Sequence, residues 1–502
     1  MLKLRSRGSR VLLLLILAYA AFLRLYRFDT LPPVLERDEA MNGCNVLQVL
    51  ETHDFKVFYP ENNGREGLYI NLAVVPVRLF GNLAWVLRLP AALFGLLTIW
   101  GVYLLGAELF STPCGLLSAL FVAASFWHMM LSRLGYRTVL APCFLVFAVY
   151  FLLRAISRSR EGKPCFGMAI LAGATYGLGF YTYISYRATP LLLAAILGAY
   201  GLRSHREGWS GPYLKAAAVF VAVAAALLVP LTVVFLRTPS FNDRISQVSV
   251  LNTPHPFVVA TKNILKTAGM FFLRGAEDVR GNVPGRPHAF WPVASMILVG
   301  AAMGVYATYR RIKYRTRLPE ALPYALVLWW MAVAAIPVVL SNEGVPHTLR
   351  ASLMIPPGFL LAGQGAVRSY AFLVSRRLPL AWILCGAFLF FAAVCYEPYR
   401  TYFKVWAVDP QLAALTGLMK VSELVNSLPM EEPKYIVATR IGPAENGVPR
   451  SLVTVAFLTR SYTRREQQYT NIHYIGNTNG APESFCGQVM ASLPGKEVIC
   501  VK

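Results

Sequence analysis

Short charged clusters interrupt a sequence that is otherwise rich in long apolar runs. Asp38 and Glu39 form the first cluster and Arg65 and Glu66 the second, both in the polar segment 27–84. A carboxylate in such a segment can act as a general base, because it can take the proton of an attacking hydroxyl. Asp38 could instead cap a helix, an interaction that stabilises a helix by about 0.5–2 kcal/mol. Arg65 and Glu66 could stand at the mouth of a cavity, or in a polar loop before a surface helix.

Arginines and aromatic residues recur in the other short polar segments. An arginine at a membrane surface suits a phosphate, which its guanidinium can bind through two parallel hydrogen bonds. The tyrosines of segment 181–187 need not bind a substrate, because the aromatic belt found at membrane surfaces also explains them. The residues of interest are Tyr136, Arg137, Arg187, Arg280, Arg286, His347 and Arg350.

Carboxylates and arginines on one side of a membrane would suit a sugar donor anchored by a polyprenyl phosphate. The lipid tail would lie in the bilayer, and arginines at its surface would neutralise the phosphate as it leaves. A carboxylate would deprotonate the incoming hydroxyl, which attacks the anomeric carbon from the opposite face. This chemistry requires no cofactor, and we predict no metal site, although Asp38, Glu39, Glu66 and His347 are of types that could ligate a divalent metal.

The composition places these clusters in a membrane protein. Of 502 residues, 56% are hydrophobic and 15% are charged, whereas soluble domains have about 45–50% apolar and about 25% charged residues. The net charge is +23, but much of the positive charge lies in short loops between apolar runs. That distribution follows the positive-inside rule and argues against nucleic acid as a partner.

A membrane-spanning helix needs about 20 apolar residues, and the sequence predicts about eleven such spans. Residues 68–80 are too short and too interrupted to span, so we expect an interfacial or re-entrant segment there. Basic residues before the first apolar run resemble a signal peptide, but no clean cleavage site follows, so we expect an uncleaved span. The predicted spans are 9–26, 85–109, 114–131, 138–155, 165–182, 188–202, 214–236, 290–308, 322–340, 351–367 and 380–396.

This arrangement satisfies the positive-inside rule if the N-terminus is cytoplasmic. The outer segments then include the acidic segment 27–84, the long loop 237–289 and everything after residue 397. The protein is accordingly predicted to be a multi-pass protein of the plasma (inner) membrane, with an extracytoplasmic C-terminal part. The basic inner loops are 156–164, 203–213, 309–320 and 368–379.

Two domains are predicted, a membrane domain at 1–396 and a small outer α/β domain at 397–502. In the second, residues 412–429 have helical spacing, whereas 434–440 and 452–460 alternate in the way typical of strands. Cys486 and Cys500 could form a disulfide in an oxidising compartment, or remain two unpaired thiols. The eight cysteines include no CxxC pair and no cluster with metal-binding spacing.

In the order of its motifs, the chain resembles the C-type (GT-C) membrane glycosyltransferases. More narrowly, it is similar to bacterial relatives of protein O-mannosyltransferases and of lipid A aminoarabinose transferase. The resemblance covers roughly residues 10–400; the order of motifs is specific, though no single motif is. The motifs are RDEA (37–40), NGREGLYI (63–70), RLPAALFGLLTIWGVYLLGAELF (88–110), SRLGYRTVLAP (132–142), YTYISYR (181–187), RGNVPGRP (280–287) and PHTLRASLMIPP (346–357).

The resemblance implies a polytopic α-helical GT-C fold and an inverting sugar transfer. It implies that Asp38, with Glu39 beside it, acts as the base or positions the acceptor. It implies that outer arginines bind the donor phosphate: Arg137, Arg286 and Arg350, with His347 near them. We further expect substrate contacts from Arg65, Glu66, Tyr136, Arg187 and Arg280. The C-terminal part, 397–502, matches no usable part of the family pattern.

The main functional hypothesis is sugar transfer from a polyprenyl-phosphate donor to a hydroxyl of a protein, lipid or envelope glycan on the outer face. The alternative is a transporter or flippase of lipid-linked sugars, which would predict internal repeats and charges at mid-bilayer. The sequence has no convincing repeat, and its charges gather at one face. A third hypothesis, a scaffold whose outer domain binds partners, leaves the arginine and carboxylate clusters unexplained.

Overall fold

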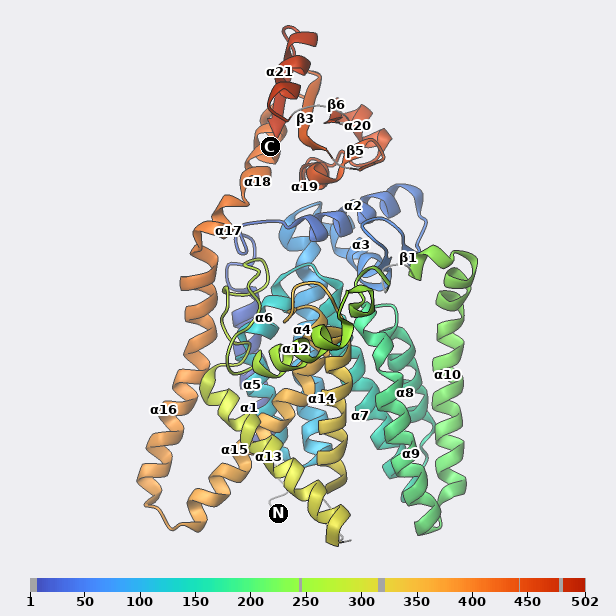
Figure 1. Ribbon diagram of the computed structural model, residues 1–502, viewed down its shortest axis with the longest axis vertical. Coiled ribbons are helices and arrows are strands. Elements are labelled where there is room, and N and C mark those ends of the chain that lie inside the picture. Colours follow the sequence, from blue (N-terminus) through green and yellow to red (C-terminus); the bar gives the residue numbers. More distant parts are fainter. Residues whose placement is uncertain (1–6, 243–245, 315–320, 442, 478–481, 502) are drawn as a thin grey trace. The chain divides into compact units, whose positions relative to one another are not determined.

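A computed structural model describes residues 7–242, 246–314, 321–441, 443–477 and 482–501 of the chain (Figure 1). Helices dominate, and a small parallel sheet lies near the C-terminus, as the sequence predicted. The internal contacts define two compact units. Unit 1 comprises Met1–Tyr26, Ala91–Arg133 and Arg137–Trp406, and unit 2 comprises Arg27–Pro90, Leu134–Tyr136 and Ala407–Lys502. The boundaries of these units differ from those of the predicted domains, 1–396 and 397–502. The two domains stay a prediction.

Unit 1 consists of helices, most of them apolar. One of them, α4 (Ala84–Leu109), begins in unit 2 and continues into unit 1. The others are α1 (Arg7–Leu25), α5 (Thr112–Ala123), α6 (Phe126–Arg133), α7 (Leu140–Arg160), α8 (Phe166–Gly179), α9 (Pro190–Glu207), α10 (Ser210–Arg237), α12 (Pro256–Gly269), α13 (Trp291–Tyr314), α14 (Ala321–Val339), α15 (Ile355–Ser375) and α16 (Leu380–Tyr399).

The predicted number of eleven spans is not confirmed. Among the described residues, seven helices are long and apolar enough to cross a membrane, or eight if the bent pair α5–α6 counts as one span. The predicted span 165–182 contains only the 14-residue helix α8. Helices α9 and α15 occupy two other predicted spans but are more polar, because α9 ends in charged residues and α15 contains Gln364 and Arg368.

The predicted span 114–131 consists of two helices, α5 and α6, which meet at an angle of 61°. Buried side chains satisfy the backbone around this bend. Arg24 donates hydrogen bonds to the Ala123 carbonyl (3.3 Å) and contacts Nδ1 of His128 (2.9 Å). Arg133 donates to the Leu23 and Arg24 carbonyls (2.9 and 2.8 Å). Cations are favoured at helix C-termini, which carry unsatisfied carbonyls, so these arginines account for the ends of α1 and α5.

Unit 2 combines the first polar segment with the C-terminal residues. The first part contains α2 (Arg37–Thr52), β1 (Phe58–Tyr59), β2 (Arg65–Glu66), α3 (Leu68–Phe80) and the start of α4. The interfacial placement predicted for residues 68–80 corresponds to α3 and stays a prediction. The second part contains α17 (Pro410–Ala414), α18 (Gly417–Ser427), β3 (Lys434–Ile441), β4 (Ala444–Glu445), β5 (Val448–Pro449), α19 (Val453–Leu458), α20 (Arg464–Thr470), β6 (Ile472–Asn477), α21 (Pro482–Ser492) and β7 (Glu497–Val501).

The C-terminal part is a small α/β fold with a parallel sheet in the order β6-β3-β7. The helical prediction for 412–429 corresponds to α17 and α18, and the alternation at 434–440 corresponds to β3. The alternation at 452–460 is misleading, because α19 forms there. Periodicity does not separate a short apolar strand from a buried helix.

Helix α19 packs against α2 in one hydrophobic core. The Phe457 ring lies so close to Gly43 that a Cβ there would be 2.5 Å from it. The Asn82 amide donates to the carbonyl of Phe457 (2.8 Å), and the Thr454 hydroxyl donates to the carbonyl of Leu35 (3.3 Å). The acidic helix α2 is therefore fixed in place by residues some 400 positions later in the chain.

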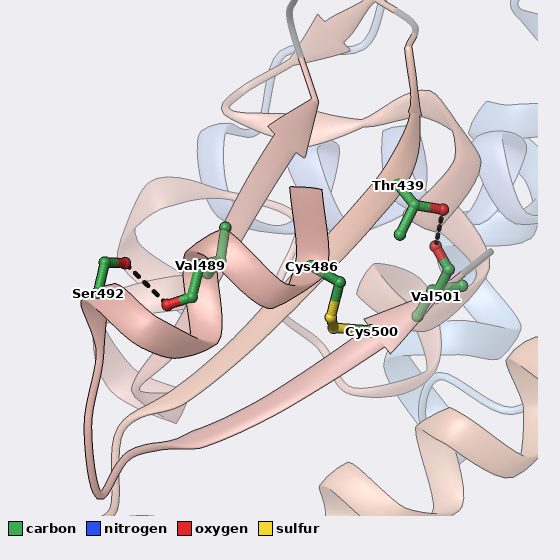
Figure 2. Close-up of a disulfide and its surroundings, with 6 residues drawn as sticks. All are labelled: Thr439, Cys486, Val489, Ser492, Cys500 and Val501. Atoms are coloured by element: carbon green, nitrogen blue, oxygen red, sulfur yellow. Dashed lines mark hydrogen bonds between the residues drawn. A yellow bond between two sulfur atoms is a disulfide. The ribbon is translucent and has the colours of Figure 1, made fainter. Parts of the chain in front are cut away.

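A disulfide joins Cys486 of α21 to Cys500 of β7, with Cα atoms 6.1 Å apart (Figure 2). Of the two alternatives that the sequence left open, a disulfide and two unpaired thiols, the structure has the disulfide. Beside the bridge, the Thr439 hydroxyl of the central strand donates to the Val501 carbonyl (3.0 Å), which helps to hold β7 in the sheet.

Candidate active site

The first turn of α2 carries the two predicted catalytic carboxylates, and its cap is unexpected. Glu36 is the N-cap residue: its side chain accepts a hydrogen bond from the Asp38 backbone (2.6 Å), and Glu39 accepts one from the Glu36 backbone (3.2 Å). This reciprocal arrangement is a capping box, here with glutamate in the place usually taken by serine or threonine. The alternative interpretation of Asp38 as the helix cap is therefore wrong.

Asp38 is half-buried, and its side chain is available for another role. Its Oδ1 accepts a hydrogen bond from the Asn62 amide at 2.8 Å. Asn62 and Asn63 have positive φ values of 53° and 64° in the turn between β1 and β2, a conformation that asparagine tolerates better than most residues. The turn thus places an amide donor on one oxygen of the Asp38 carboxylate.

Glu39 lies deeper than Asp38 and is bound on both oxygens. It is 0% exposed, and its carboxylate pairs with Arg88 through Nε–Oε1 (2.8 Å) and Nη2–Oε2 (3.0 Å) contacts. It also accepts the backbone N–H of Gly135. Arg88 in turn donates to the carbonyls of Pro32 (3.1 Å) and Val34 (2.6 Å). The two adjacent carboxylates therefore differ: Glu39 is buried and anchors the helix, whereas Asp38 is more accessible.

Arg88 was not singled out from the sequence. The available signal was an arginine inside the predicted span 85–109, because a charge at membrane depth requires a partner. Nothing local in the sequence identified Glu39, 49 residues earlier, as that partner.

Arg65 lies beneath α2 and is almost fully buried. It donates to Oδ1 of Asn42 (2.7 Å), to Oδ1 of Asn45 and to the Glu61 carbonyl (3.3 Å). Since Asn42 and Asn45 are three residues apart, they share one face of α2. The Asn42 amide donates to the Gly135 carbonyl (2.9 Å), so these bonds tie β2, α2 and Gly135 together.

Tyr136 and Glu66 complete the predicted residues of unit 2. The Tyr136 hydroxyl donates to the Glu36 carboxylate (3.3 Å). Glu66 is buried on β2, where it pairs with Phe58 of β1. Unit 2 therefore brings Asp38, Glu39, Arg65 and Tyr136 together around the first turns of α2, with Glu66 beside Arg65.

In unit 1, three predicted arginines have carboxylate partners. Arg286 pairs with Glu397, a residue that sequence reasoning missed, and lies 5.0 Å from the centre of the Phe126 ring. The buried Arg350 bonds to Glu343 (2.6 Å) and to the Ser341 hydroxyl. Arg280 bonds to Asp278 at 2.7 Å. A guanidinium that holds a carboxylate has the planar donor geometry that also fits a phosphate.

The other two predicted arginines of unit 1 lie over aromatic rings. Arg137 is 5.4 Å from the Tyr183 ring centre, and Arg187 is 4.6 Å from that of Phe235. Cation–π contacts of this kind restrict the position of a guanidinium.

His347 lies near Arg350 and is neutral at physiological pH. Burial and the charge of Arg350 lower the pKa of His347 to about 4. Its Nδ1 accepts the backbone N–H of Leu349 at 3.3 Å. His347 can therefore offer a hydrogen bond to a ligand but no positive charge.

Candidate metal ligands do not cluster in the described parts of the chain. Among those residues, the structure shows no group of three or more His, Cys, Asp or Glu side chains that could hold a metal ion. That no cofactor is required stays a prediction.

The long apolar helices of the described residues are those of an integral, multi-pass membrane protein. Residues 72–235 match the family of dolichyl-phosphate-mannose-protein mannosyltransferases. The structure is similar to ArnT from Cupriavidus metallidurans bound to undecaprenyl phosphate, with a TM-score of 0.54 and 15% identity over 99% of this chain and 90% of that one.

The structure is also similar to the oligosaccharyltransferase AglB from Archaeoglobus fulgidus in complex with an inhibitory peptide and a dolichol-phosphate. The TM-score is 0.54 and the identity 14%, over 94% of this chain and 69% of that one. No curated protein matches the sequence. Residues 72–235 thus match the mannosyltransferase family, and the fold of the chain is similar to the folds of ArnT and AglB, which confirms the resemblance predicted from the order of the motifs.

Proposed function

We propose that this protein is a glycosyltransferase that moves a sugar from a polyprenyl-phosphate donor to an acceptor hydroxyl at the outer face of the membrane. The observation that carries the proposal is the state of Asp38: a half-buried carboxylate in the first turn of α2, oriented by Asn62 and not used as a cap. The family match supports sugar transfer. The structures of ArnT with undecaprenyl phosphate and of AglB with dolichol-phosphate support a lipid-linked donor.

In this proposal Asp38 is the general base. Asn62 donates to Oδ1, and Oδ2 takes the proton of the acceptor hydroxyl. The acceptor oxygen then bonds to the anomeric carbon while the bond from that carbon to the phosphate oxygen breaks, and polyprenyl phosphate leaves. A positioned base of this kind contributes about 10²–10⁴-fold to a rate. Inversion at the anomeric carbon is the outcome that the resemblance implies.

Glu39 acts by positioning. Both of its oxygens are bound and the residue is inaccessible to solvent, so it cannot reach an acceptor without breaking its pair with Arg88. The Glu39–Arg88 pair fixes the first turn of α2 and hence the direction of Asp38. Arg65 has a similar supporting role through Asn42 and Asn45, and Tyr136 through Glu36.

The donor phosphate is assigned to Arg137, Arg286 and Arg350, with further substrate contacts from Glu66, Arg187 and Arg280. For Arg286 and Arg350, a phosphate would exchange with the carboxylates of Glu397 and Glu343, since both kinds of anion fit the guanidinium. Because His347 is neutral, the arginines must neutralise the negative charge of the departing phosphate.

The disulfide between Cys486 and Cys500 supports an extracytoplasmic C-terminal part, because disulfides persist in oxidising compartments. Together with the basic inner loops, it supports a multi-pass protein of the plasma membrane with a cytoplasmic N-terminus. The acceptor is a hydroxyl of a protein, a lipid or an envelope glycan, and no cofactor is required.

The test is turnover of a panel of radiolabelled polyprenyl-phosphate sugars by the purified protein in nanodiscs, with detergent-solubilised membrane extract as the source of acceptors. Release of polyprenyl phosphate together with transfer of label to an acceptor would support the proposal. Movement of labelled lipid between leaflets of a proteoliposome, without cleavage of any donor, would instead favour a transporter.

A further inference from the structure

Helix α12, in the long loop 237–289, buries two of its polar residues and exposes its large apolar ones. Asn263 and Thr267 are buried, whereas Phe257, Leu265 and Ile264 are 87%, 69% and 53% exposed. A surface helix of a water-soluble fold shows the opposite pattern, with its apolar stripe facing the core. The surroundings of α12 must therefore differ from bulk water.

The exposed residues form a regular stripe. At 3.6 residues per turn, Phe257, Ile264 and Leu265 fall within a sector about 120° wide, together with Val258. The exposed Thr261 lies in the same sector, and its hydroxyl donates to the Phe257 carbonyl (2.8 Å). Lys262 lies about 40° beyond one edge of this sector, and Lys266, one turn later, lies about 80° beyond the same edge. An apolar stripe bordered by lysines is the pattern of helices that lie in a membrane interface, where the amines reach towards lipid phosphates.

The depth of α12 follows from its contact with a candidate membrane span. The Asn263 amide donates to the carbonyls of Val339 (3.0 Å) and Ser341 (2.8 Å). Val339 is the last residue of α14, one of the seven helices suited to cross a membrane. Helix α12 runs across the direction of α14 at that end (Figure 1). The apolar stripe therefore lies at the level where α14 reaches the membrane surface.

Large apolar side chains are also exposed just before and just after the helix. Leu251 is 73% exposed before α12, and Leu273 is 80% exposed after it. Exposed apolar surface of this kind marks sites that bind a partner or a membrane. The position of the stripe at the end of α14, with lysines at its border, selects the bilayer as the occupant.

We propose that α12 is an interfacial membrane helix, with its apolar stripe in the boundary between acyl chains and headgroups. Asn263 anchors it to the end of α14, and Lys262 and Lys266 face the lipid phosphates. This placement does not depend on the proposed catalytic activity. It adds one consequence if that activity is right: the segment carrying Arg286 is held at membrane level, because the backbone N–H of His288 bonds to the carbonyl of Met270 at 2.9 Å, just after α12.

The test is site-directed spin labelling of the full chain in nanodiscs. Phe257→Cys and Leu265→Cys probe the stripe, and Glu277→Cys is the matched control, because Glu277 is an exposed polar residue of the same loop. The background carries Cys385→Ser and Cys395→Ser, which removes the free cysteines that are not buried. Power saturation then compares the accessibility of each nitroxide to oxygen, which enters lipid, and to a nickel chelate, which stays in water.

We expect oxygen accessibility to exceed nickel accessibility several-fold at residues 257 and 265, and the order to reverse at residue 277. Nickel accessibility higher than oxygen accessibility at all three positions would place α12 in water and overturn the proposal. Low accessibility to both reagents at 257 and 265 would also overturn it, since another protein surface would then cover the stripe. The labelled residues are exposed, and Val258→Cys provides a further position on the stripe if one variant is poorly expressed.

Discussion

The buried pair of Glu39 and Arg88 gives the sharpest structural prediction. Breaking a buried ion pair by removal of one partner costs about 3–5 kcal/mol, because the other charge remains uncompensated. Arg88→Met removes both contacts to Glu39 and the bonds to Pro32 and Val34, while Glu39 stays fully buried. We therefore expect the opening free energy of unit 2 to fall by about that amount.

The alkylation rate of Cys44 measures this opening locally, because Cys44 is a free and fully buried thiol in the core of unit 2. At about 1.4 kcal/mol per tenfold change, a loss of 3–5 kcal/mol should accelerate labelling by between about 10² and 10⁴. The exposed arginine of α3 provides the control, since Arg78→Met should change the rate little. Mass spectrometry of the Cys44 peptide separates this signal from the other cysteines.

A double variant tests the cause. Glu39→Gln combined with Arg88→Met removes both charges, so its effect should be smaller than the sum of the single effects by about 0.5–3 kcal/mol. Additive effects, or an Arg88→Met rate no faster than that of Arg78→Met, would refute the assignment of this pair as the anchor of α2.

Three further predictions concern the remaining structure. Replacing Cys500 by Ser opens a bridge between residues 14 positions apart; for a loop of that length we expect a loss of about 3 kcal/mol, seen as a lower thermal midpoint. Gly43→Ala should destabilise unit 2 by about 1–3 kcal/mol through overlap with the Phe457 ring, and Phe457→Leu in the same chain should recover part of that loss. Since the pKa of His347 lies at about 4, below the value of about 6.5 for an unfolded chain, the unfolded state binds the proton first and stability should fall as the pH drops from 6.5 towards 4. His347→Gln should remove that part of the pH dependence, whereas His255→Gln, at an exposed site, should retain it.

The sequence predicted the helical membrane fold because long apolar runs carry that information locally. One alternative for Asp38 was a position at the start of a helix, and α2 does begin at Arg37. The cap was missed because glutamate is not a preferred N-cap residue, so Glu36 gave no signal. The bend between α5 and α6 was missed because neither Ala124 nor Ser125 is a helix breaker.

Partners far apart in the chain were beyond local patterns. Arg286 was predicted to bind a phosphate, but no local pattern pointed to Glu397, 111 residues away. The shared core of α2 and α19 depends on a glycine that admits the Phe457 ring, and a lone Gly43 in a helix has many explanations. Such contacts depend on the tertiary fold, because the residues are too far apart in the sequence for a local periodic pattern to relate them.

The most direct test of the central claim compares wild type with Asp38→Asn in the turnover of the preferred polyprenyl-phosphate sugar. Asp54→Asn is the control, because Asp54 is an exposed carboxylate shortly after α2. We predict a loss of about 10²–10⁴-fold in turnover for Asp38→Asn, with unchanged Cys44 protection and unchanged donor binding. Asp54→Asn should match wild type. Equal turnover by Asp38→Asn and wild type would contradict the claim that Asp38 is the catalytic base.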